Sequence, residues 1–335
     1  MKKVSVIVPI YNVEKYIKRC LDSLIVSEIM DDIEILVVND GGKDHSVEII
    51  QKYVDSYPET VRLIDKENGG HGSTINAGIK EAKGKYFRVL DSDDWFNSTD
   101  FVKFVNRLKS EDADLVVCDY RKEHTYNSKS EYFVYKNLED RKCYCFDDID
   151  LKILEGEYFV MATSTYKTEI LRTSGLKMLE KTFYVDMQYN VVPMTKVETF
   201  TYYHLDIYRY FIGRDDQSVN EKVMIKRIDQ QIRVNKLMAD AFHNCQFDSK
   251  HLKKYMLSYL DIITTVSSIM LVRAGTQEAL DKKKEMLEYI REQDLWLYHK
   301  LRYSILGRAA NLPGRGGRKM FVAAYKVCQK FYGFN

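Results

Sequence analysis

An acidic cluster, Asp91-Ser92-Asp93-Asp94, directly follows the apolar stretch at residues 86–90. A short buried strand that ends in clustered carboxylates would place oxygen ligands at the carboxyl edge of a sheet, where open α/β sheets bind their ligands. Hard divalent cations prefer carboxylate oxygens, and Mg²⁺ usually joins one or two carboxylates to substrate phosphates. The cluster therefore suggests a site for a metal and a diphosphate, although Asp and Ser also end strands by forming turns and capping helices.

Three other polar motifs follow predicted strands or lead into a predicted helix. They are, in chain order, Pro9-Ile10-Tyr11-Asn12, Asn39-Asp40-Gly41-Gly42 and the glycine-rich segment at residues 67–78. The strand ends of a parallel sheet share one edge, so these motifs and the acidic cluster can converge on one ligand. Glycine lets backbone approach a ligand closely, and a helix that begins near Ser73 would offer free N–H groups to an anion. A simple turn and helix entry would use the same residues.

The elements that must position these motifs alternate through the first 120 residues. The predicted strands are residues 4–9, 33–39, 61–64, 86–91 and 113–119. The predicted helices are residues 14–27, 44–57, 73–82 and 100–109. This alternation predicts βαβ units and an α/β fold, in which a mostly parallel sheet is flanked by helices. Near-continuous runs of Val, Ile and Leu are typical of strands that are buried on both faces.

The pattern changes after residue 120. Residues 121–145 are polar and rich in Tyr, which favours an extended hairpin or insert. Two further strands are predicted at residues 159–166 and 200–211, with a helix between them at residues 186–196. From residue 221 to residue 298 the apolar spacing is helical throughout. We therefore predict one domain over residues 1–215 and a helical C-terminal region over residues 216–335.

Composition places the chain among soluble globular proteins. The 335 residues suffice for about two domains, and 51 Lys and Arg against 49 Asp and Glu indicate no general affinity for nucleic acid. The six cysteines show no C-x-x-C pair, so we expect reduced thiols in a cytoplasmic protein rather than a zinc site. The apolar start is interpreted as a first strand rather than a signal peptide, because it is short and reaches Pro9 without a small-residue cleavage site. We expect no transmembrane helix, since no uninterrupted apolar stretch reaches about 18 residues.

The chain after Asp294 differs in kind, because it contains no acidic residue. Its basic residues are Lys300, Arg302, Arg308, Arg315, Arg318, Lys319, Lys326 and Lys330. Aromatic and aliphatic side chains are mixed with them on predicted helices on both sides of Pro313. This mixture suits a peripheral contact with an anionic bilayer. A solvated basic helix packed on the domain, a contact with a partner subunit in an oligomer, or nucleic-acid binding would show the same pattern.

Together the four strand-end motifs resemble the inverting family 2 glycosyltransferases, which have the GT-A fold. The resemblance covers residues 3–120 well and continues more loosely to residue 215. It implies that residues 1–215 form a nucleotide-sugar-binding and catalytic domain with a Rossmann-like sheet. It also implies that Pro9, Tyr11 and Asn12 line the pocket for the nucleotide base. Asp40 would accept a hydrogen bond from a uracil ring, or else cap the following helix.

The same resemblance assigns roles in the later motifs. Gly70 and Asn76 would contact the nucleotide sugar, although helix packing accounts for Asn76 equally well. His71 could contact the substrate, but it is interpreted as a solvated loop histidine. In the Asp-x-Asp pattern of the acidic cluster, Asp91 and Ser92 would lie on the ribose or uridine side. Asp93 would ligate Mn²⁺ or Mg²⁺. Asp94 would tune the site or contact the sugar. Asp93 and Asp94 would complete the donor site.

An inverting transfer also needs a base for the acceptor hydroxyl. In the family this base is an Asp, usually the second residue of a Glu-Asp pair at a helix start. Asp186 is the match here, with Val185 in place of Glu. Its apolar neighbours would raise its pKa by desolvation and make it a better base near neutral pH. The alternative is a helix N-cap. Arg209 or Arg214 could pair with the diphosphate, or be surface arginines.

We therefore expect metal-dependent transfer of one sugar from a nucleotide sugar, with a UDP-sugar favoured. The acceptor would be a saccharide or lipid-linked saccharide in surface polysaccharide or glycoprotein glycan assembly, at the inner face of the cell membrane. A processive synthase is disfavoured, because the segment at residues 230–234 lacks the Trp of Gln-x-x-Arg-Trp. A nucleotidyltransferase is an alternative, but no glycine-rich, Arg-containing loop follows the first strand, and no dehydrogenase G-x-G-x-x-G does either. A catalytically silent partner that binds nucleotide sugar is the third class.

Overall fold

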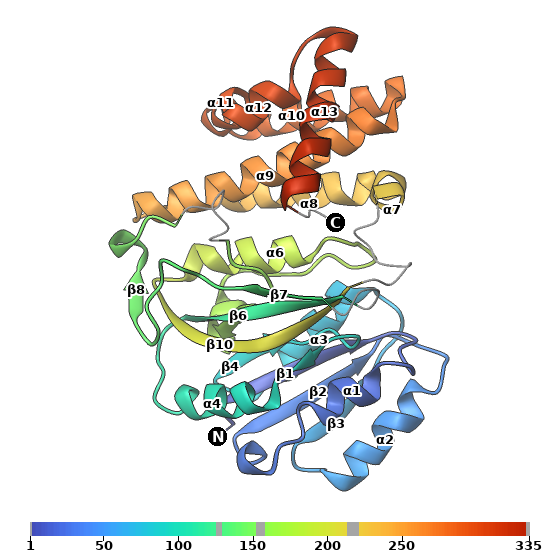
Figure 1. Ribbon diagram of the computed structural model, residues 1–335, viewed down its shortest axis with the longest axis vertical. Helices are drawn as coiled ribbons and strands as arrows, with labels where there is room; N and C mark the ends of the chain where they lie inside the picture. The colour runs from blue at the N-terminus through green and yellow to red at the C-terminus, as the bar shows by residue number, and fades with distance from the viewer. Residues whose placement is uncertain (1, 125–128, 152–157, 213–220, 333–335) are drawn as a thin grey trace. The chain divides into compact units, whose positions relative to one another are not determined.

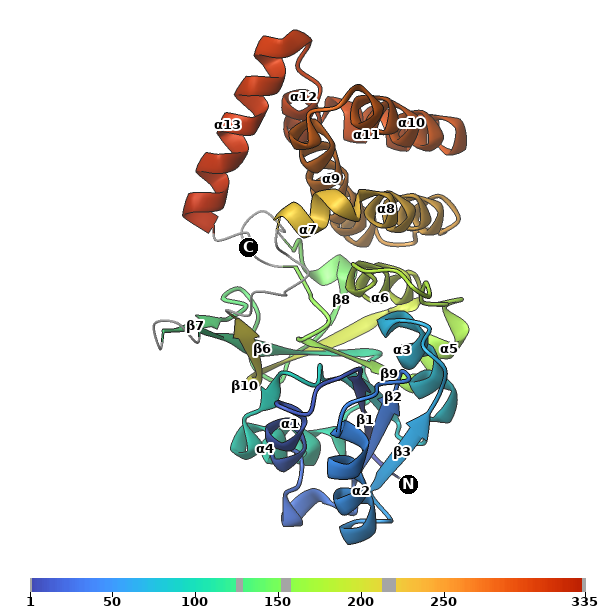
Figure 2. The same ribbon diagram turned by 90° about the vertical axis from the view of Figure 1, so that its right-hand side faces the viewer.

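The computed structural model describes residues 2–124, 129–151, 158–212 and 221–332. It divides into two compact units, the first formed by Met1–Ile149 with Phe159–Gly213 and the second by Asp150–Tyr158 with Arg214–Asn335. Figures 1 and 2 show the sheet of the first unit and the helices of the second. The predicted domain boundary at residue 215 lies outside the described residues.

Within the described residues, the strands of the first unit form one mixed sheet in the order β3-β2-β1-β4-β9-β6-β10-β5, with β7 on β6 and β8 on β10. The strands are β1 (Val4–Ile10), β2 (Ile33–Asn39), β3 (Val61–Asp65), β4 (Tyr86–Val89), β5 (Trp95–Phe96), β6 (Leu115–His124), β7 (Ser130–Phe133), β8 (Cys143–Cys145), β9 (Ser164–Lys167) and β10 (Thr199–Ile212). The helices are α1 (Ile17–Asp22), α2 (Ser46–Ser56), α3 (His71–Glu81), α4 (Ser98–Leu108), α5 (Thr168–Thr173) and α6 (Asp186–Val191). The predicted α/β class is confirmed.

The parallel part of the sheet is β3-β2-β1-β4, as the alternating pattern predicted. Every residue of β1 and β2 is buried, which explains why both strands are continuous apolar runs. Their ends lie at one edge, because Ile10 pairs with Asn39 and the backbone N–H of Asp40 donates to the carbonyl of Ile10 over 3.0 Å. The N–H of Leu90 donates to Ile7 over 2.9 Å, which brings the end of β4 to the same edge.

Three predicted elements differ in the structure. The helix expected at residues 14–27 is shorter, because α1 covers Ile17–Asp22 and a separate 3₁₀ turn covers Ser27–Ile29. The strand expected at residues 159–166 is shorter, because β9 covers Ser164–Lys167 and runs antiparallel between β4 and β6. The helix expected at residues 186–196 is divided into α6 and a 3₁₀ turn at Pro193–Lys196. Proline has no N–H to donate and clashes with the preceding helical turn, so α6 stops before Pro193.

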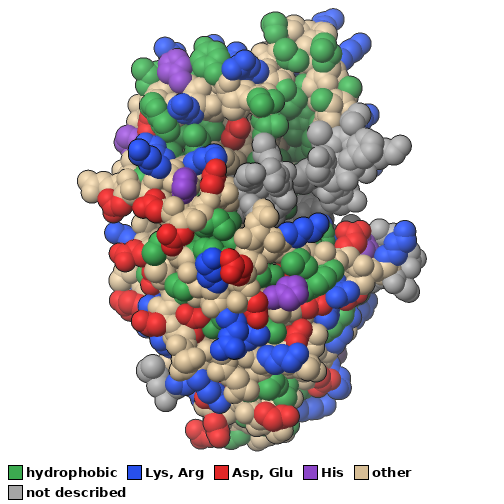
Figure 3. Space-filling model, turned by 60° about the vertical axis from the view of Figure 1, so that its left-hand side comes forward, with side chains coloured by type: hydrophobic (Ala, Val, Ile, Leu, Met, Phe, Trp, Pro, Cys, Tyr) green, Lys and Arg blue, Asp and Glu red, His purple; other side chains and the backbone are tan. Residues whose placement is uncertain are grey.

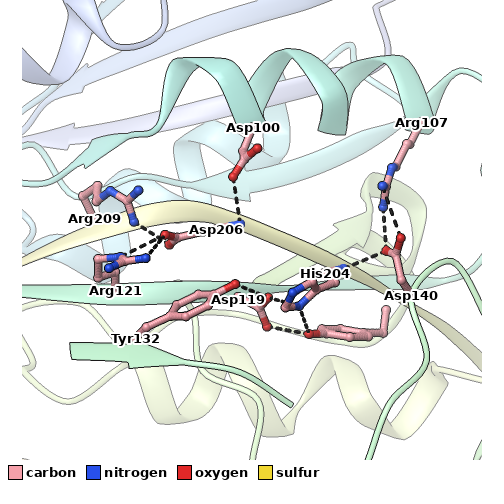
Figure 4. A network of polar contacts seen from close by, with 10 residues as sticks. Asp100, Arg107, Asp119, Arg121, Tyr132, Asp140, His204, Asp206 and Arg209 are labelled. Carbon is pink, nitrogen blue, oxygen red and sulfur yellow. Dashed lines mark hydrogen bonds and ion pairs between the residues drawn. The ribbon is translucent and has the colours of Figure 1, made fainter. Parts of the chain in front are cut away.

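The predicted hairpin begins with a long β6, which continues to His124 and pairs antiparallel with β7. A polar network around the buried Asp119 ties these strands to β10 (Figure 4). The Asp119 carboxylate accepts hydrogen bonds from Tyr132 Oη over 3.0 Å and from Tyr202 Oη over 2.7 Å. His204 Nδ1 lies 2.9 Å from the same carboxylate. The network therefore fixes β10, whose far end reaches the acidic cluster.

The second unit is helical over its described residues. Its helices are α7 (Glu221–Lys226), α8 (Ile228–His243), α9 (Lys250–Ala274), α10 (Gln277–Gln293), α11 (Leu295–Tyr303), α12 (Ile305–Ala310) and α13 (Gly314–Tyr332). The segment that was predicted to be helical throughout is divided into separate helices, and three of these helices begin after capping residues. Thr276, Asp294 and Ser304 each accept a backbone N–H at the start of the next helix, over 3.2, 2.9 and 2.8 Å. Gly275 ends α9 in the left-handed region at φ 74°.

Helix α9 is the core of this unit and packs against α7, α8, α10, α11, α12 and α13. Among the described residues, it is one helix that is long and apolar enough to cross a membrane by length and composition alone. However, 67% of its most apolar window is buried inside the unit. Burial by neighbouring helices accounts for that apolar character without a membrane.

Candidate active site

The loops after β1 and β2 meet at the carboxyl edge of the sheet. Tyr11 is 53% exposed there, and Asn12 adopts a left-handed backbone at φ 53°. The side-chain oxygen of Asn12 accepts the N–H of Lys43 over 2.7 Å, which joins the two loops. Pro9 is buried in β1 and has no N–H to continue the pairing with β4, whose last pair is Ile7 with Val89. Tyr11 and Asn12 are therefore accessible to a nucleotide, whereas Pro9 shapes the turn from inside the sheet.

Asp40 binds the glycine-rich turn. Its buried carboxylate accepts the backbone N–H groups of Gly69 and Gly70, each over 2.8 Å, and pairs with Lys66 Nζ at 2.7 Å. Burial alone would raise the pKa of Asp40, but these N–H groups and the Lys66 charge hold it below its ordinary value. The alternative of a helix cap is wrong, since α2 begins at Ser46 without Asp40. Recognition of uracil by Asp40 stays a prediction.

The glycines of this turn allow another part of the chain to approach. Gly70 has φ 83°, and a Cβ on it would lie 2.9 Å from the backbone nitrogen of Lys181. A Cβ on Gly72 would lie 2.3 Å from the carbonyl oxygen of Leu179. The Lys181 N–H donates to Gly69 over 2.6 Å. The turn is therefore packed against the segment that leads to Asp186.

Asn76 holds the same segment from α3. Its amide accepts the N–H of Met178 over 2.9 Å and donates to the Met178 carbonyl over 3.0 Å. Gln188 of α6 binds the same segment. Its side-chain oxygen accepts the N–H of Leu179 over 3.0 Å, and its side-chain nitrogen donates to the carbonyl of Lys177 over 2.6 Å. The structure thus gives Asn76 a positioning role, while its contact with a nucleotide sugar stays a prediction.

The acidic cluster is fastened to β10 through Asp94. This residue is 0% exposed, and its carboxylate accepts Tyr208 Oη over 2.6 Å and the Phe211 N–H over 2.7 Å. Burial, followed by the charges of Asp93 and Asp91, raises the pKa of Asp94 well above its ordinary value. Asp94 exposes no surface to a sugar in this structure and positions the cluster instead. Sugar contact by Asp94 stays a prediction, as does ribose contact by the buried Ser92.

Arg19 of α1 supports the cluster from outside it. Its guanidinium lies 3.8 Å from the ring centroid of Trp95 and 4.5 Å from that of Phe211. The Nη2 group also donates to the backbone carbonyl of Asp93 over 2.8 Å. This clamp joins α1, the cluster and the end of β10. The sequence contained no signal for it, because one Arg in an amphipathic helix is ordinary.

His71 is the residue that the sequence interpretation placed wrongly. It is the first residue of α3 rather than a solvated loop residue, and its Nε2 lies 2.9 Å from Asp91 Oδ1. Burial alone would lower the pKa of His71, but the hydrogen bond and charge of Asp91 outweigh it, with a further contribution from Asp186, and the pKa is raised. His71 therefore links the acidic cluster to the predicted base.

Asp186 is the first residue of α6 and is half-buried. The position before it belongs to Val185, and no side-chain cap is made there, so the alternative of an N-cap is wrong. Burial raises the pKa of Asp186, the charge of His71 opposes the rise and that of Asp91 adds to it. The direction is the one expected for a desolvated base.

The predicted phosphate ligand Arg209 has protein partners. Its guanidinium pairs with Asp206 (Figure 4). Its Nε also lies 3.6 Å from Glu123. A phosphate would compete with both carboxylates, so pairing with a diphosphate stays a prediction. Arg214, the second candidate, lies outside the described residues.

The arrangement can hold a cation and a diphosphate together. Asp91 and Asp93 are half-buried at the sheet edge. Across the described ranges, no group of three or more His, Cys, Asp or Glu side chains is placed to hold a metal ion. Mg²⁺ is usually bound by one or two carboxylates and completes its coordination with substrate phosphates and water, so two carboxylates are sufficient protein ligands.

Comparison with known proteins identifies the family. Residues 5–172, half of the chain, match the model described as Glycosyl transferase family 2. The chain is 39% identical over 127 residues to the putative glycosyltransferase EpsH of Bacillus subtilis, and 41% identical over 120 residues to the uncharacterized glycosyltransferase EpsJ of that organism. These matches cover 38% and 36% of this chain but only 36% and 34% of the relatives.

The fold has solved counterparts. A crystal structure of residues 1–349 of S. aureus TarS in complex with UDP-GlcNAc superposes with a TM-score of 0.72 at 18% identity, over 97% of this chain and 92% of that one. The mannosyltransferase PcManGT of Pyrobaculum calidifontis, in complex with GDP-Man and Mn²⁺, superposes with a TM-score of 0.54 at 15% identity, over 98% and 87%. The strand-end motifs, the sheet and these matches agree, and the chain belongs to glycosyltransferase family 2 with the GT-A fold.

Proposed function

We propose that this chain is a metal-dependent inverting glycosyltransferase of the hexosyltransferase type. It moves one sugar from a nucleotide sugar, favoured to be a UDP-sugar, to a hydroxyl of an acceptor. The observation that carries the proposal is that His71 contacts Asp91 of the acidic cluster at 2.9 Å and lies within electrostatic reach of Asp186, from a segment about 90 residues later. This proximity supports a donor site and a base at one edge of the sheet.

A divalent cation fits this edge. Asp93, together with Asp91, would hold Mn²⁺ or Mg²⁺. Burial raises the pKa of the neighbouring Asp94, and the charges of Asp93 and Asp91 raise it further; a cation would offset that second contribution. The solved PcManGT complex contains Mn²⁺. When bound, the cation stabilises negative charge on the departing nucleoside diphosphate.

The residues of the chain supply the remaining chemistry. Asp186 takes the proton of the acceptor hydroxyl as its oxygen attacks the anomeric carbon of the donor. The new C–O bond forms on the face opposite the diphosphate, the old C–O bond breaks, and its electron pair leaves with the diphosphate oxygen. His71 holds Asp91 and lies within electrostatic reach of Asp186, so it positions the two carboxylates relative to each other.

The acceptor is proposed to be a saccharide or lipid-linked saccharide, in surface polysaccharide or glycoprotein glycan assembly at the cytoplasmic face of the membrane. The basic, aromatic composition after Asp294 supports this location. Nucleotidyl transfer would instead release pyrophosphate from a nucleoside triphosphate. A silent partner would bind nucleotide sugar without turnover.

Calorimetric titration of UDP, GDP and CDP, with Mn²⁺ and again with EDTA, tests the donor class. We expect UDP to bind tightly with Mn²⁺ and at least tenfold more weakly after chelation. Preference for GDP or CDP would overturn the UDP assignment but keep the fold. Binding that EDTA leaves unchanged would contradict metal dependence, and turnover of a UDP-sugar would exclude the silent partner.

The Arg19 clamp makes a second prediction. Arg19→Met should weaken Mn²⁺-dependent UDP binding about tenfold, because the lost cation–π and carbonyl contacts free the Asp93 backbone. Calorimetry measures the affinity. Lys18→Met, on the exposed side of the same helix, is the matched control and should leave it unchanged. Unchanged binding in Arg19→Met would show that the clamp does not position Asp93.

A further inference from the structure

Charge is distributed unevenly along this chain. All 49 acidic residues and 43 of the 51 Lys and Arg residues lie at or before Asp294, whereas the last 41 residues contain eight Lys and Arg and no acid. The body of the chain is therefore net negative and the C-terminal helices are strongly positive. Figure 3 shows Lys and Arg side chains beside hydrophobic ones on the surface of the helical unit. Sequence alone left a bilayer, a solvated helix, a partner subunit and a nucleic acid as explanations, and the packing of α12 and α13 bears on the choice between them.

Helix α13 packs one face on the helical core and leaves the other exposed. Phe321 is 6% exposed and belongs to a core cluster with Met270 and Leu271 of α9, against which Val322 and Tyr325 also pack. Residues 318, 321, 322 and 325 have the i, i+3, i+4, i+7 spacing of an inward helical stripe. Met320 is exposed on the outward face, and Arg315, Lys319 and Lys326 are exposed along its edge, on the flank of α13 that turns towards α9.

This outward face is apolar as well as basic. Met320 is 66% exposed, and Ile305, at the start of the neighbouring α12, is 85% exposed. Helix α12 contacts both α11 and α13, and the exposed Trp296 and Tyr303 lie on α11. A single exposed Ile or Met is ordinary on a protein surface, but several large apolar side chains on three adjoining helices indicate an interaction surface. The solvated-helix explanation therefore leaves these side chains unexplained.

A groove lies between α13 and α9. Its volume is about 440 Å³, and Arg315, Arg318, Lys319 and Lys326 line it together with apolar atoms that include Val272. The positive charge extends to the adjoining Lys283, where burial, followed by the charges of Arg302 and Arg318, lowers the pKa to about 8. The four basic side chains are complementary in charge to an anionic lipid headgroup, and the apolar atoms of the groove suit its acyl chains.

We propose that the α12–α13 face, defined by Ile305, Arg315, Lys319, Met320 and Lys326, binds the surface of an anionic lipid bilayer. The cations receive headgroup phosphates, and Ile305 and Met320 enter the interface. Charge complementarity selects the bilayer over an apolar protein partner. This proposal concerns the second unit and does not depend on the glycosyl transfer proposed for the first.

Vesicle co-sedimentation of the full chain tests it. We expect binding to phosphatidylcholine vesicles that contain 30% phosphatidylglycerol, little binding to pure phosphatidylcholine, and release at high salt. The triple variant R315Q/K319Q/K326Q should lower the partition coefficient on the order of 100-fold, since each cation near such a surface contributes about one factor of five. Ile305→Ser with Met320→Ser should lower it at constant charge.

The matched control is K52Q/K80Q/K83Q, which removes three exposed charges from the first unit and should bind as the unaltered chain does. Circular dichroism and thermal melting show that the variants fold, and UDP binding by calorimetry is expected to be unchanged in all of them. Failure of the unaltered chain to bind anionic vesicles would overturn the proposal, as would equal losses in the two triple variants. Loss of self-association in place of vesicle binding would identify the face as a contact between copies and also overturn it.

Discussion

Asp186→Asn is expected to lower the rate of sugar transfer about 1,000-fold, which is in the range typical of lost general base catalysis. The affinity for UDP in the presence of Mn²⁺ should stay within about threefold of that of the unaltered chain. The amide keeps the size and shape of the carboxyl group but cannot take the proton of the acceptor hydroxyl. Because Asp186 lies in a different segment from the Asp-x-Asp pattern, donor binding and proton transfer should separate. Initial rates with a UDP-sugar, together with calorimetry, measure the two effects.

The pH profile of transfer follows from the position of Asp186. Burial, with the charge of Asp91, raises its pKa above that of an ordinary Asp, and the His71 charge limits the rise. The group must be deprotonated to act, so the rate should fall as pH falls through this raised pKa. The acidic limb of the kcat profile should therefore lie above the pH at which an ordinary carboxyl titrates. In Asp186→Asn that limb should disappear.

The control for this variant is Glu180→Gln. Glu180 is an exposed residue of the same segment, and no catalytic role is proposed for its carboxyl group. It should retain transfer activity. If Asp186→Asn kept near-full activity, the base would lie elsewhere and the assignment of Asp186 would be wrong. If it lost donor binding as well, Asp186 would be part of the donor site rather than the base.

Asp93→Ala is expected to abolish the difference between UDP titrations with Mn²⁺ and with EDTA. Loss of one charged ligand should weaken Mn²⁺-dependent binding about 100-fold, and transfer should fall below detection. The backbone of Asp93 stays held by Arg19, so the cluster should keep its place when the side chain is removed. Calorimetry with and without chelator is the measurement.

Asp31→Ala, at an exposed position away from this edge, is the matched control and should bind UDP as the unaltered chain does. A melting temperature close to that of the unaltered chain would show that the Asp93 variant folds. Persistent Mn²⁺-dependent binding in Asp93→Ala would mean that Asp91 or another group holds the cation. The metal assignment of Asp93 would then fail even if glycosyl transfer itself were observed.

The sequence alone predicted the parallel core and the edge where the site forms. Buried strands such as β1 and β2 can be recognised as near-continuous apolar runs, and the polar motifs at their ends mark the carboxyl edge. The spacing of these motifs also identified the family. Asp186 was found through a resemblance, because no local pattern links it to a sheet edge more than 90 residues earlier.

Only the tertiary structure decided which partner each polar side chain takes. Asp40 and Asn76 were expected to contact the donor, but here they hold the glycine-rich turn and the segment before Asp186. His71 was expected in solvent, yet it binds Asp91, and nothing in the sequence pointed to Arg19. Periodicity and motifs report burial and chain direction, which are local properties. A hydrogen bond between residues far apart in sequence depends on how loops meet in space, and the fold alone determines that.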